Sequence, residues 1–180
     1  MSNFTFLAQN NEKDNYVKQA CLLAMSIRAT NRTSKICLIT NDKVPTQYDH
    51  LFNDVVPIPF QDTAKHDKWK VQNRWKIYHA TPYEETFVMD TDMLVLQDLS
   101  NWWNLMQNYE VFLTTKPKTY RQENIIDSYY RPSYVANELP NIYCAIHYFK
   151  KSNFAKQFYT WLELVMKNYE KFYKLYSPKR

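Results

Sequence analysis

The sequence predicts an α/β fold in which a mostly parallel central sheet is flanked by helices. Short, continuous apolar runs predict strands that are buried on both faces, as in parallel sheets. These runs alternate with segments whose apolar residues recur at helical spacing, which is typical of β-α-β units. The 180 residues, 45% of them apolar, are enough for one hydrophobic core. Because the sequence has no internal repeat and no linker-like segment, we expect a single domain over residues 1–180.

The first half of the chain alternates predicted strands and helices. Asp14 precedes a stretch of helical periodicity and is the expected N-cap of that helix. Pro57 indicates that the third strand lies at the sheet edge or ends there. The predicted order is strand 4–8, helix 16–29, strand 36–40, short helix 45–52 and strand 54–58.

The second half is predicted to end in one long amphipathic helix. Its apolar residues Phe154, Phe158, Trp161 and Val165 recur at helical spacing and are expected to face the sheet. Residues 115–141 lack periodicity, and long irregular segments of compact domains are usually functional loops. The predicted elements between these are helix 69–79, strand 86–89, helix 99–106, strand 111–114 and strand 142–149.

The chain contains no glycine. This excludes functions that depend on glycine-rich motifs, such as the dinucleotide fingerprint, the P-loop and the nucleophile elbow. Turns that need a positive φ are expected at Asn or Asp, the next most tolerant residues.

Net charge and cysteine content indicate the kind of ligand and the cellular compartment. The net charge of +5 comes from dispersed lysines and arginines, which suits an anionic ligand and does not predict nucleic-acid binding. Cys21, Cys37 and Cys144 form no C-x-x-C pair and are expected to be buried thiols in a reducing, cytoplasmic compartment. We expect neither a signal peptide nor a membrane span, because no basic leader and no apolar run of about 18 residues is present.

The strongest local signal is the segment FVMDTDMLVL, in which Asp90 and Asp92 stand between the apolar runs 87–89 and 94–96. In an extended backbone the two carboxylates project to the same side. Carboxylate oxygens suit Mn²⁺ or Mg²⁺, and such a cation binds a diphosphate and stabilises a leaving group. The alternative interpretation is a strand end followed by ordinary acidic turn residues.

This segment resembles the metal-binding strand of nucleotide-sugar-dependent glycosyltransferases of the GT-A fold, and the chain is most similar to the glycogenin-like family 8. Two features carry the resemblance: residues 87–96, followed by a tryptophan pair, and a polar turn at Asp14 with Tyr16 before a helix. The resemblance implies a GT-A fold, a UDP-sugar donor, and a Mn²⁺ or Mg²⁺ cofactor. It also implies that Asp90 and Asp92 are the metal-binding and catalytic residues.

The resemblance further implies where the donor binds. Uridine is expected at Asp14 and Tyr16, and the helix before the acidic strand is expected to direct Lys70 or Arg74 at the donor phosphates. Considered alone, Tyr16 also fits a core position, and the two cations also fit a solvated basic face. The full predicted set for nucleotide and donor is Gln9, Asn10, Asn11, Asp14, Tyr16, Lys70, Arg74 and Thr91.

The chain also departs from the family pattern. Tyr143 and Ala145 stand where relatives carry Asn and Gly, and the later His that completes the metal site in relatives has no equivalent. The chain therefore resembles a minimal member of the family. The third metal ligand is expected from water, from donor phosphates or from His147.

Together these features predict metal-dependent transfer of a hexose from UDP-glucose or UDP-galactose to an unidentified hydroxyl acceptor, with donor hydrolysis as a side activity. Similarity to family 8 favours retention, whereas an inverting enzyme needs a carboxylate base. A non-catalytic nucleotide-sugar-binding module and a nucleotidyltransferase are the alternatives, although the latter normally uses a Gly-rich loop. The segment expected to bind acceptor offers the possible bases Glu123, Asp127 and Glu138 and the possible sugar platform Tyr120, Tyr129, Tyr130 and Tyr134.

Overall fold

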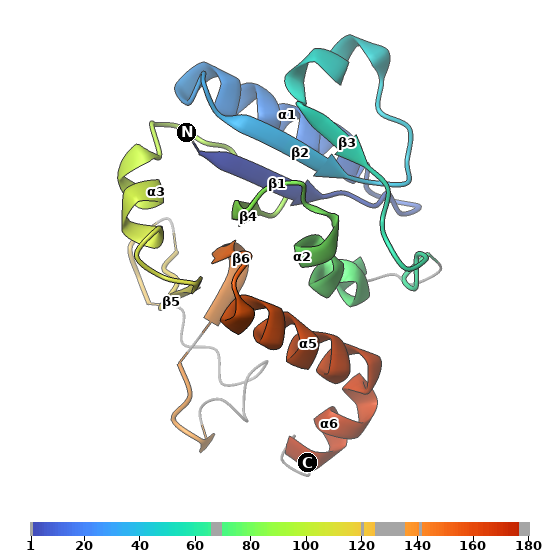
Figure 1. Ribbon diagram of the computed structural model, residues 1–180, viewed down its shortest axis with the longest axis vertical. Coiled ribbons are helices and arrows are strands. Elements are labelled where there is room, and N and C mark those ends of the chain that lie inside the picture. The colour runs from blue at the N-terminus through green and yellow to red at the C-terminus, as the bar shows by residue number, and fades with distance from the viewer. Residues whose placement is uncertain (1, 66–69, 120, 125–135, 141, 177–180) are drawn as a thin grey trace.

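Figure 1 shows a computed structural model of the chain, which describes residues 2–65, 70–119, 121–124, 136–140 and 142–176. Its strands are β1 (Asn3–Leu7), β2 (Lys35–Ile39), β3 (Asp54–Val56), β4 (Glu85–Met89), β5 (Val111–Thr115) and β6 (Ile142–Lys150). Within these residues the strands form a six-stranded sheet in the order β3-β2-β1-β4-β6-β5.

The sheet is mostly parallel, as predicted. β1 pairs in parallel with β2 and β4, and β2 pairs in parallel with β3. β6 is antiparallel to both β4 and β5. β3 is an edge strand that ends just before Pro57, so both expectations from that proline are confirmed.

Helices cover both faces of the sheet. α1 (Tyr16–Thr30) and α3 (Ser100–Met106) pack on one face, and α2 (Ile77–Ala80) and α5 (Asn153–Lys167) pack on the other. In β4, Phe87 and Met89 belong to the first cluster and Val88 to the second. A strand buried on both faces has no polar face, which is why the apolar runs predicted these strands.

The predicted helix 69–79 is instead a 3-10 helix, η2 (Lys70–Lys76), that continues into the short α2. A second 3-10 helix, η1 (Thr46–Leu51), stands where a short helix was expected. Residue 69 lies outside the described residues. In a 3-10 helix, side chains three positions apart lie on the same side, and this spacing determines which residues of η2 reach the functional site.

The expected N-cap of α1 was wrong by one residue. Asn15 Oδ1 accepts the N–H of Lys18 at 2.8 Å, which makes Asn15 the cap. Asp14 instead donates its backbone N–H to Asn11 Oδ1 at 2.7 Å. Asn and Asp are equally good caps, and the turn closed by Asn11 places Asn15 at the capping position.

The expected C-terminal helix is two helices, α5 and α6 (Tyr169–Tyr176), separated at Asn168. The predicted inner face is wrong in part: Phe154 and Trp161 are 54% and 62% exposed, whereas Phe158 packs against the second core cluster as predicted. Ala155 and Tyr159 are the buried residues of α5.

The cap of α5 explains this choice of face. Ser152 Oγ accepts the N–H of Ala155 at 3.1 Å and fixes the first turn directly after β6. That turn directs Ala155, and with it Tyr159 one turn later, toward the sheet. Figure 1 shows α5 running from the end of β6 along the sheet, with α6 turning away from it.

Three smaller expectations are corrected. The apolar run 94–96 is buried only at Val95, because Leu94 and Leu96 are 63% and 86% exposed. Cys144 is exposed, while the other two thiols are buried as predicted. Among the described residues, the positive φ angles fall on neither Asn nor Asp but on Phe60, Gln61, Lys116, Gln122 and Glu138.

The irregular segment 115–141 is described only in part. Glu123 and Glu138 are exposed, and Lys118 forms an isolated bridge with Asn124. The other predicted residues of this segment, Tyr120, Asp127, Tyr129, Tyr130 and Tyr134, lie outside the described residues. No helix in the described part of the chain is both long and apolar enough to cross a membrane.

Candidate functional site

A cavity of about 240 Å³ opens at the carboxyl ends of β1 and β4. From β1 the sheet continues through β2 and β3, and from β4 it continues through β6 and β5 in the other direction. The cavity therefore lies at the topological switch point, where open α/β sheets bind their ligands. It is lined by Leu7, Gln9, Tyr16, Lys70, Val71, Arg74, Ile77, Val88, Met89, Asp90, Thr91, Asp92 and His147.

The acidic pair lies in the turn that follows β4. The backbone N–H of Asp90 donates to the carbonyl of Ala145 at 2.9 Å, which ties the turn to β6. Oδ1 of Asp90 accepts a hydrogen bond from Nη2 of Arg74 at 2.6 Å. Asp92 is exposed and has no hydrogen-bond or ion-pair partner among the described residues. Its carboxylate oxygens are therefore accessible to a ligand.

Arg74 reaches Asp90 because of the 3-10 winding of η2. Val71, Arg74 and Ile77 are spaced three apart, and all of them line the cavity. The side chains of Arg74 and Asp90 are 36% and 29% exposed, so their ion pair is partly shielded from water. One row of the helix thus supplies both the apolar wall and a cation of the site.

Lys70 supplies a second cation at the first position of η2. Its ammonium donates to the carbonyls of Ala64 at 2.7 Å and Lys65 at 2.8 Å. These contacts neutralise no charge, and the carboxylate that senses the charge of Lys70 is Asp62, whose pKa it helps to lower. The structure places both predicted phosphate-binding cations, Lys70 and Arg74, at one site.

Gln9 is held by a buried amide and a carboxylate. Asn73, fully buried in η2, donates to Gln9 Oε1 at 2.8 Å and to Asp62 Oδ1 at 2.7 Å. Gln9 in turn donates through Nε2 to Asp62 Oδ2 at 2.8 Å. Burial alone raises the pKa of Asp62, but hydrogen bonds from Asn73, Gln9 and a backbone N–H lower it overall. Sequence reasoning missed Asp62 and Asn73, because polar residues in a loop and a helix carry no local signal.

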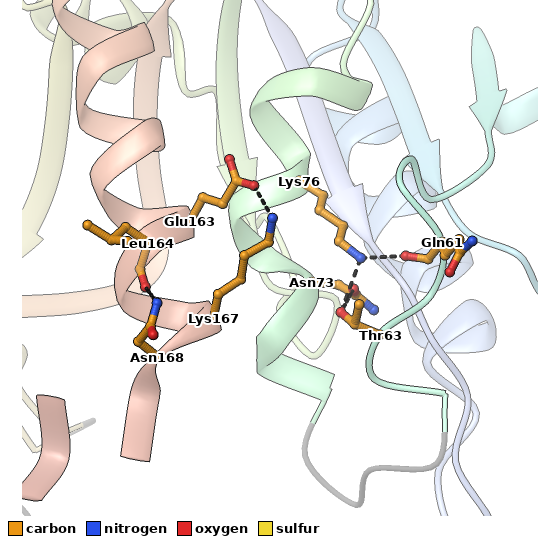
Figure 2. A network of polar contacts seen from close by, with 8 residues as sticks. All are labelled: Gln61, Thr63, Asn73, Lys76, Glu163, Leu164, Lys167 and Asn168. Carbon is orange, nitrogen blue, oxygen red and sulfur yellow. Dashed lines mark hydrogen bonds and ion pairs between the residues drawn. The ribbon is translucent and has the colours of Figure 1, made fainter. Parts of the chain in front are cut away.

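The loop that carries Asp62 is attached to η2 by a buried lysine. Lys76 is 1% exposed and donates to the carbonyl of Gln61 and to Thr63 Oγ1, as Figure 2 shows. Burial lowers the pKa of Lys76. Phe60 stacks on Trp75 with ring centroids 5.8 Å apart, which helps the loop to keep two successive positive φ angles.

The turn between β1 and α1 presents Tyr16 to the cavity, and Tyr16 also packs against the first core cluster, so both positions considered for it are found. Asn10 Oδ1 accepts the N–H of Val17 at 3.1 Å, and the N–H of Asn10 donates to Asp42 at 2.7 Å. Three predicted donor residues, Asn10, Asn11 and Asp14, do not line the cavity. The contacts of these residues stabilise the turn that positions Tyr16.

A larger hollow of about 800 Å³ lies between η2 and the C-terminal helices. Its wall includes Gln72 and Trp75, the row of η2 that faces away from the acidic pair, together with Lys167 and Lys171. Figure 2 shows Lys167 paired with Glu163 along α5. Among the described residues that line this hollow there is no pair of carboxylates, so the smaller cavity is the better candidate for diphosphate chemistry.

Comparison with known proteins rests on structure. No protein-family model matches the sequence, and no curated protein matches it either. The galactosyltransferase LgtC, solved with donor and acceptor sugar analogues, superimposes with a TM-score of 0.61 at 13% identity over 97% of this chain. Glycosyltransferase GlyE of Streptococcus pneumoniae gives 0.59 at 14% identity over 98%. Mouse xyloside xylosyltransferase 1 gives 0.55 at 9% identity over 94%.

The chain has the GT-A glycosyltransferase fold. It spans 64% of the length of the LgtC chain, 43% of the GlyE chain and 76% of the xylosyltransferase chain. These identities establish a shared fold, while the chemistry of this chain has to be argued from its own residues.

The acidic turn carries two carboxylates that could hold a metal ion. Asp90 and Asp92 offer the hard oxygen atoms that Mn²⁺ and Mg²⁺ bind, so the residues fit such an ion. In the part of the chain that is described, no three His, Cys, Asp or Glu side chains are grouped closely enough to hold a metal. His147, which the sequence offered as a third ligand, is therefore not grouped with Asp90 and Asp92 in this structure, and further ligands of a cation would come from water or from a bound diphosphate.

His147 lines the same cavity from β6. Its Nδ1 lies 3.1 Å from the carbonyl of Cys144, so Nδ1 carries the proton and Nε2 keeps its lone pair. Burial lowers the pKa of His147 to about 4, and the ring is neutral near pH 7. The imidazole is thus in the protonation state in which Nε2 can accept a hydrogen bond from a ligand in the cavity.

Tyr143 is a neighbour of the site that sequence reasoning did not include. Burial raises the pKa of its phenol, and the charges of Asp90 and Asp92 raise it further. The phenol is therefore close enough to the acidic pair to sense it, although Tyr143 itself is 42% exposed. The sequence signalled this residue only as a departure from the family pattern.

Proposed function

We propose that the protein is a metal-dependent glycosyltransferase that transfers a hexose from a UDP-sugar to a hydroxyl acceptor. The observation that carries the proposal is the single cavity that gathers Asp90, Asp92, Arg74 and Lys70 with the polar and aromatic side chains of Gln9 and Tyr16. Carboxylates can bind a metal cation, basic side chains can bind a diphosphate, and a flat aromatic ring can stack on a nucleobase.

Asp90 and Asp92 would hold Mn²⁺ or Mg²⁺, and when bound this ion stabilises the negative charge of the departing diphosphate. Asp92 is the more accessible ligand because it has no partner in the described part of the chain. Lys70 and Arg74 add positive charge where the leaving group would develop its own charge.

At the nucleotide end, the ring of Tyr16 offers a stacking surface. Gln9 uses one amide hydrogen and one carbonyl lone pair on Asp62 and Asn73, so one hydrogen and one lone pair are left for a ligand. A donor and an acceptor side by side complement the imide edge of uracil. This supports a uridine nucleotide, and the family 8 resemblance makes UDP-glucose and UDP-galactose the first donors to test and favours retention of configuration.

Donor turnover tests this proposal directly. The protein is incubated with a panel of nucleotide sugars and Mn²⁺, and released nucleotide is measured with and without simple sugar acceptors. We expect UDP release above background from a UDP-hexose, with water as the competing acceptor because the cavity is open at Asp92. EDTA should abolish the release, and a panel without any turnover would contradict an enzymatic role.

A second candidate function is a non-catalytic module that binds nucleotide sugars. The grouping of only two metal-binding side chains in the described residues favours it. The discriminating result is Mn²⁺-dependent binding of UDP without turnover of any UDP-sugar. A nucleotidyltransferase would instead bind nucleoside triphosphates, and thermal shift with UDP, UDP-sugars and nucleoside triphosphates, with and without Mn²⁺, separates it from both candidates.

A further inference from the structure

The acidic pair is asymmetric because only one of its carboxylates has a cationic partner. Nη2 of Arg74 lies 2.6 Å from Oδ1 of Asp90, whereas Asp92 has no ion pair among the described residues. A hydrogen bond between charged groups at this distance is among the strong ones. Asp90 is thus already neutralised by a residue of the same cavity.

A divalent cation and the guanidinium compete for Asp90. The printed contact of Arg74 uses only Oδ1 of Asp90, so Oδ2 remains available to a metal ion. A cation bound there would lie close to the guanidinium, and two positive groups within about 4 Å repel each other strongly in a partly shielded site. A metal ion that takes Asp90 as a ligand therefore weakens the contact with Arg74. A guanidinium that leaves Asp90 needs another anion, and a diphosphate offers oxygens that match its fork geometry.

We propose that Arg74 is an internal counter-ion that competes with the divalent cation for Asp90 and is drawn away by the donor diphosphate. This inference rests on the proposed function. Diphosphate binding frees Asp90 for the metal, and metal binding frees Arg74 for the diphosphate. The two ligands then bind cooperatively, and the coupling is reciprocal.

Lys70 provides a matched control for this role. It lines the same cavity and carries the same charge, but its ammonium is held by the carbonyls of Ala64 and Lys65 and not by a carboxylate. Removing Lys70 removes one positive charge from the cavity without releasing Asp90. The difference between variants at Arg74 and at Lys70 therefore isolates the competition from a general charge effect.

The test measures Mn²⁺ affinity by electron paramagnetic resonance, with and without saturating UDP, in the wild type, Arg74→Met, Arg74→Gln and Lys70→Met. Without nucleotide, both Arg74 variants are expected to bind Mn²⁺ about fivefold more tightly than wild type, as expected for loss of a partly exposed ion pair. Lys70→Met should change this affinity clearly less. The factor by which UDP tightens Mn²⁺ binding should fall in the Arg74 variants by a similar amount. Circular dichroism of each variant confirms its fold.

The outcomes separate this inference from the proposed function. Unchanged or weaker nucleotide-free Mn²⁺ binding in both Arg74 variants would overturn the counter-ion role, while Mn²⁺-dependent UDP binding by the wild type would leave the proposed function standing. Equal tightening in Lys70→Met would also overturn it, because charge alone would then explain the effect. If the wild type binds neither Mn²⁺ nor UDP, the proposed function fails and the inference fails with it.

Discussion

Asn73 and Gln9 are joined by a hydrogen bond of 2.8 Å between the buried amide of Asn73 and Oε1 of Gln9. The same amide donates to Asp62, and Oδ1 of Asn73 accepts from the hydroxyl of Thr63 at 3.0 Å. One side chain inside η2 therefore fixes both a wall of the cavity and the loop beside it. Both polar atoms of that side-chain amide have hydrogen-bond partners. A buried network whose polar groups are all paired is more rigid than one with unpaired groups.

The first prediction follows from this contact. Asn73→Ala should destabilise the protein by about 2–4 kcal/mol, because it leaves several polar groups without their partner. Urea unfolding followed by fluorescence measures the change. Asn104→Ala, at an exposed position of α3, is the control and should stay within about 0.5 kcal/mol of wild type. Equal stability of the two variants would mean that the network does not hold the fold.

The second prediction concerns pH. The pKa of Asp62 is lowered in the folded protein, so its ionised form adds stability above the unfolded pKa of about 3.9. That contribution is lost as the pH falls through the lowered folded pKa. We expect Asp62→Asn to be less stable than wild type at pH 6, with the difference shrinking in increasingly acid buffers. A gap in unfolding free energy that stays constant down to pH 3 would contradict this.

The third prediction distinguishes the two faces of α5. Tyr159 is 1% exposed and stacks on Tyr78 at 4.8 Å between ring centroids, whereas Trp161 is 62% exposed. Tyr159→Ala should cost about 3–5 kcal/mol, the usual range for a buried aromatic side chain. Trp161→Ala should cost less than about 1 kcal/mol. Thermal unfolding of both variants measures the two losses of stability. A larger loss in Trp161→Ala than in Tyr159→Ala would support the inner face that periodicity predicted.

The strands and the acidic pair were predictable from the sequence because each has a local signature. A strand such as β4 is buried on both faces, so its apolar run stands out without knowledge of its neighbours. Asp90 and Asp92 interrupt apolar sequence at the end of that strand, where a buried charge is costly unless a partner or a metal ion compensates it. Tyr16, Lys70 and Arg74 required the family resemblance, and the structure then gathered them at the cavity.

The rest depended on tertiary contacts that leave no local trace. α5 carries aromatic residues on more than one side, so periodicity alone does not select the face that the Ser152 cap sets. Asp62 and Lys76 look like ordinary loop and surface residues until the fold packs the loop 60–63 against η2. Phe60 and Gln61 adopt positive φ angles that propensity assigns to Asn or Asp. At Phe60, stacking on Trp75 helps to offset the cost of the positive φ angle.

The central claim is that the acidic turn binds a cation that helps to hold a uridine diphosphate. Calorimetric titration of UDP into the wild type, in Mn²⁺ and in EDTA, tests it together with Asp92→Asn and the distant control Asp49→Asn, an exposed residue of η1. We predict that wild type and Asp49→Asn bind UDP only with Mn²⁺, and that Asp92→Asn weakens this affinity by about tenfold or more, or about 1.4 kcal/mol, without a change in unfolding temperature. Unchanged Mn²⁺-dependent UDP affinity in Asp92→Asn, or equal UDP affinity of the wild type in Mn²⁺ and in EDTA, would contradict the account.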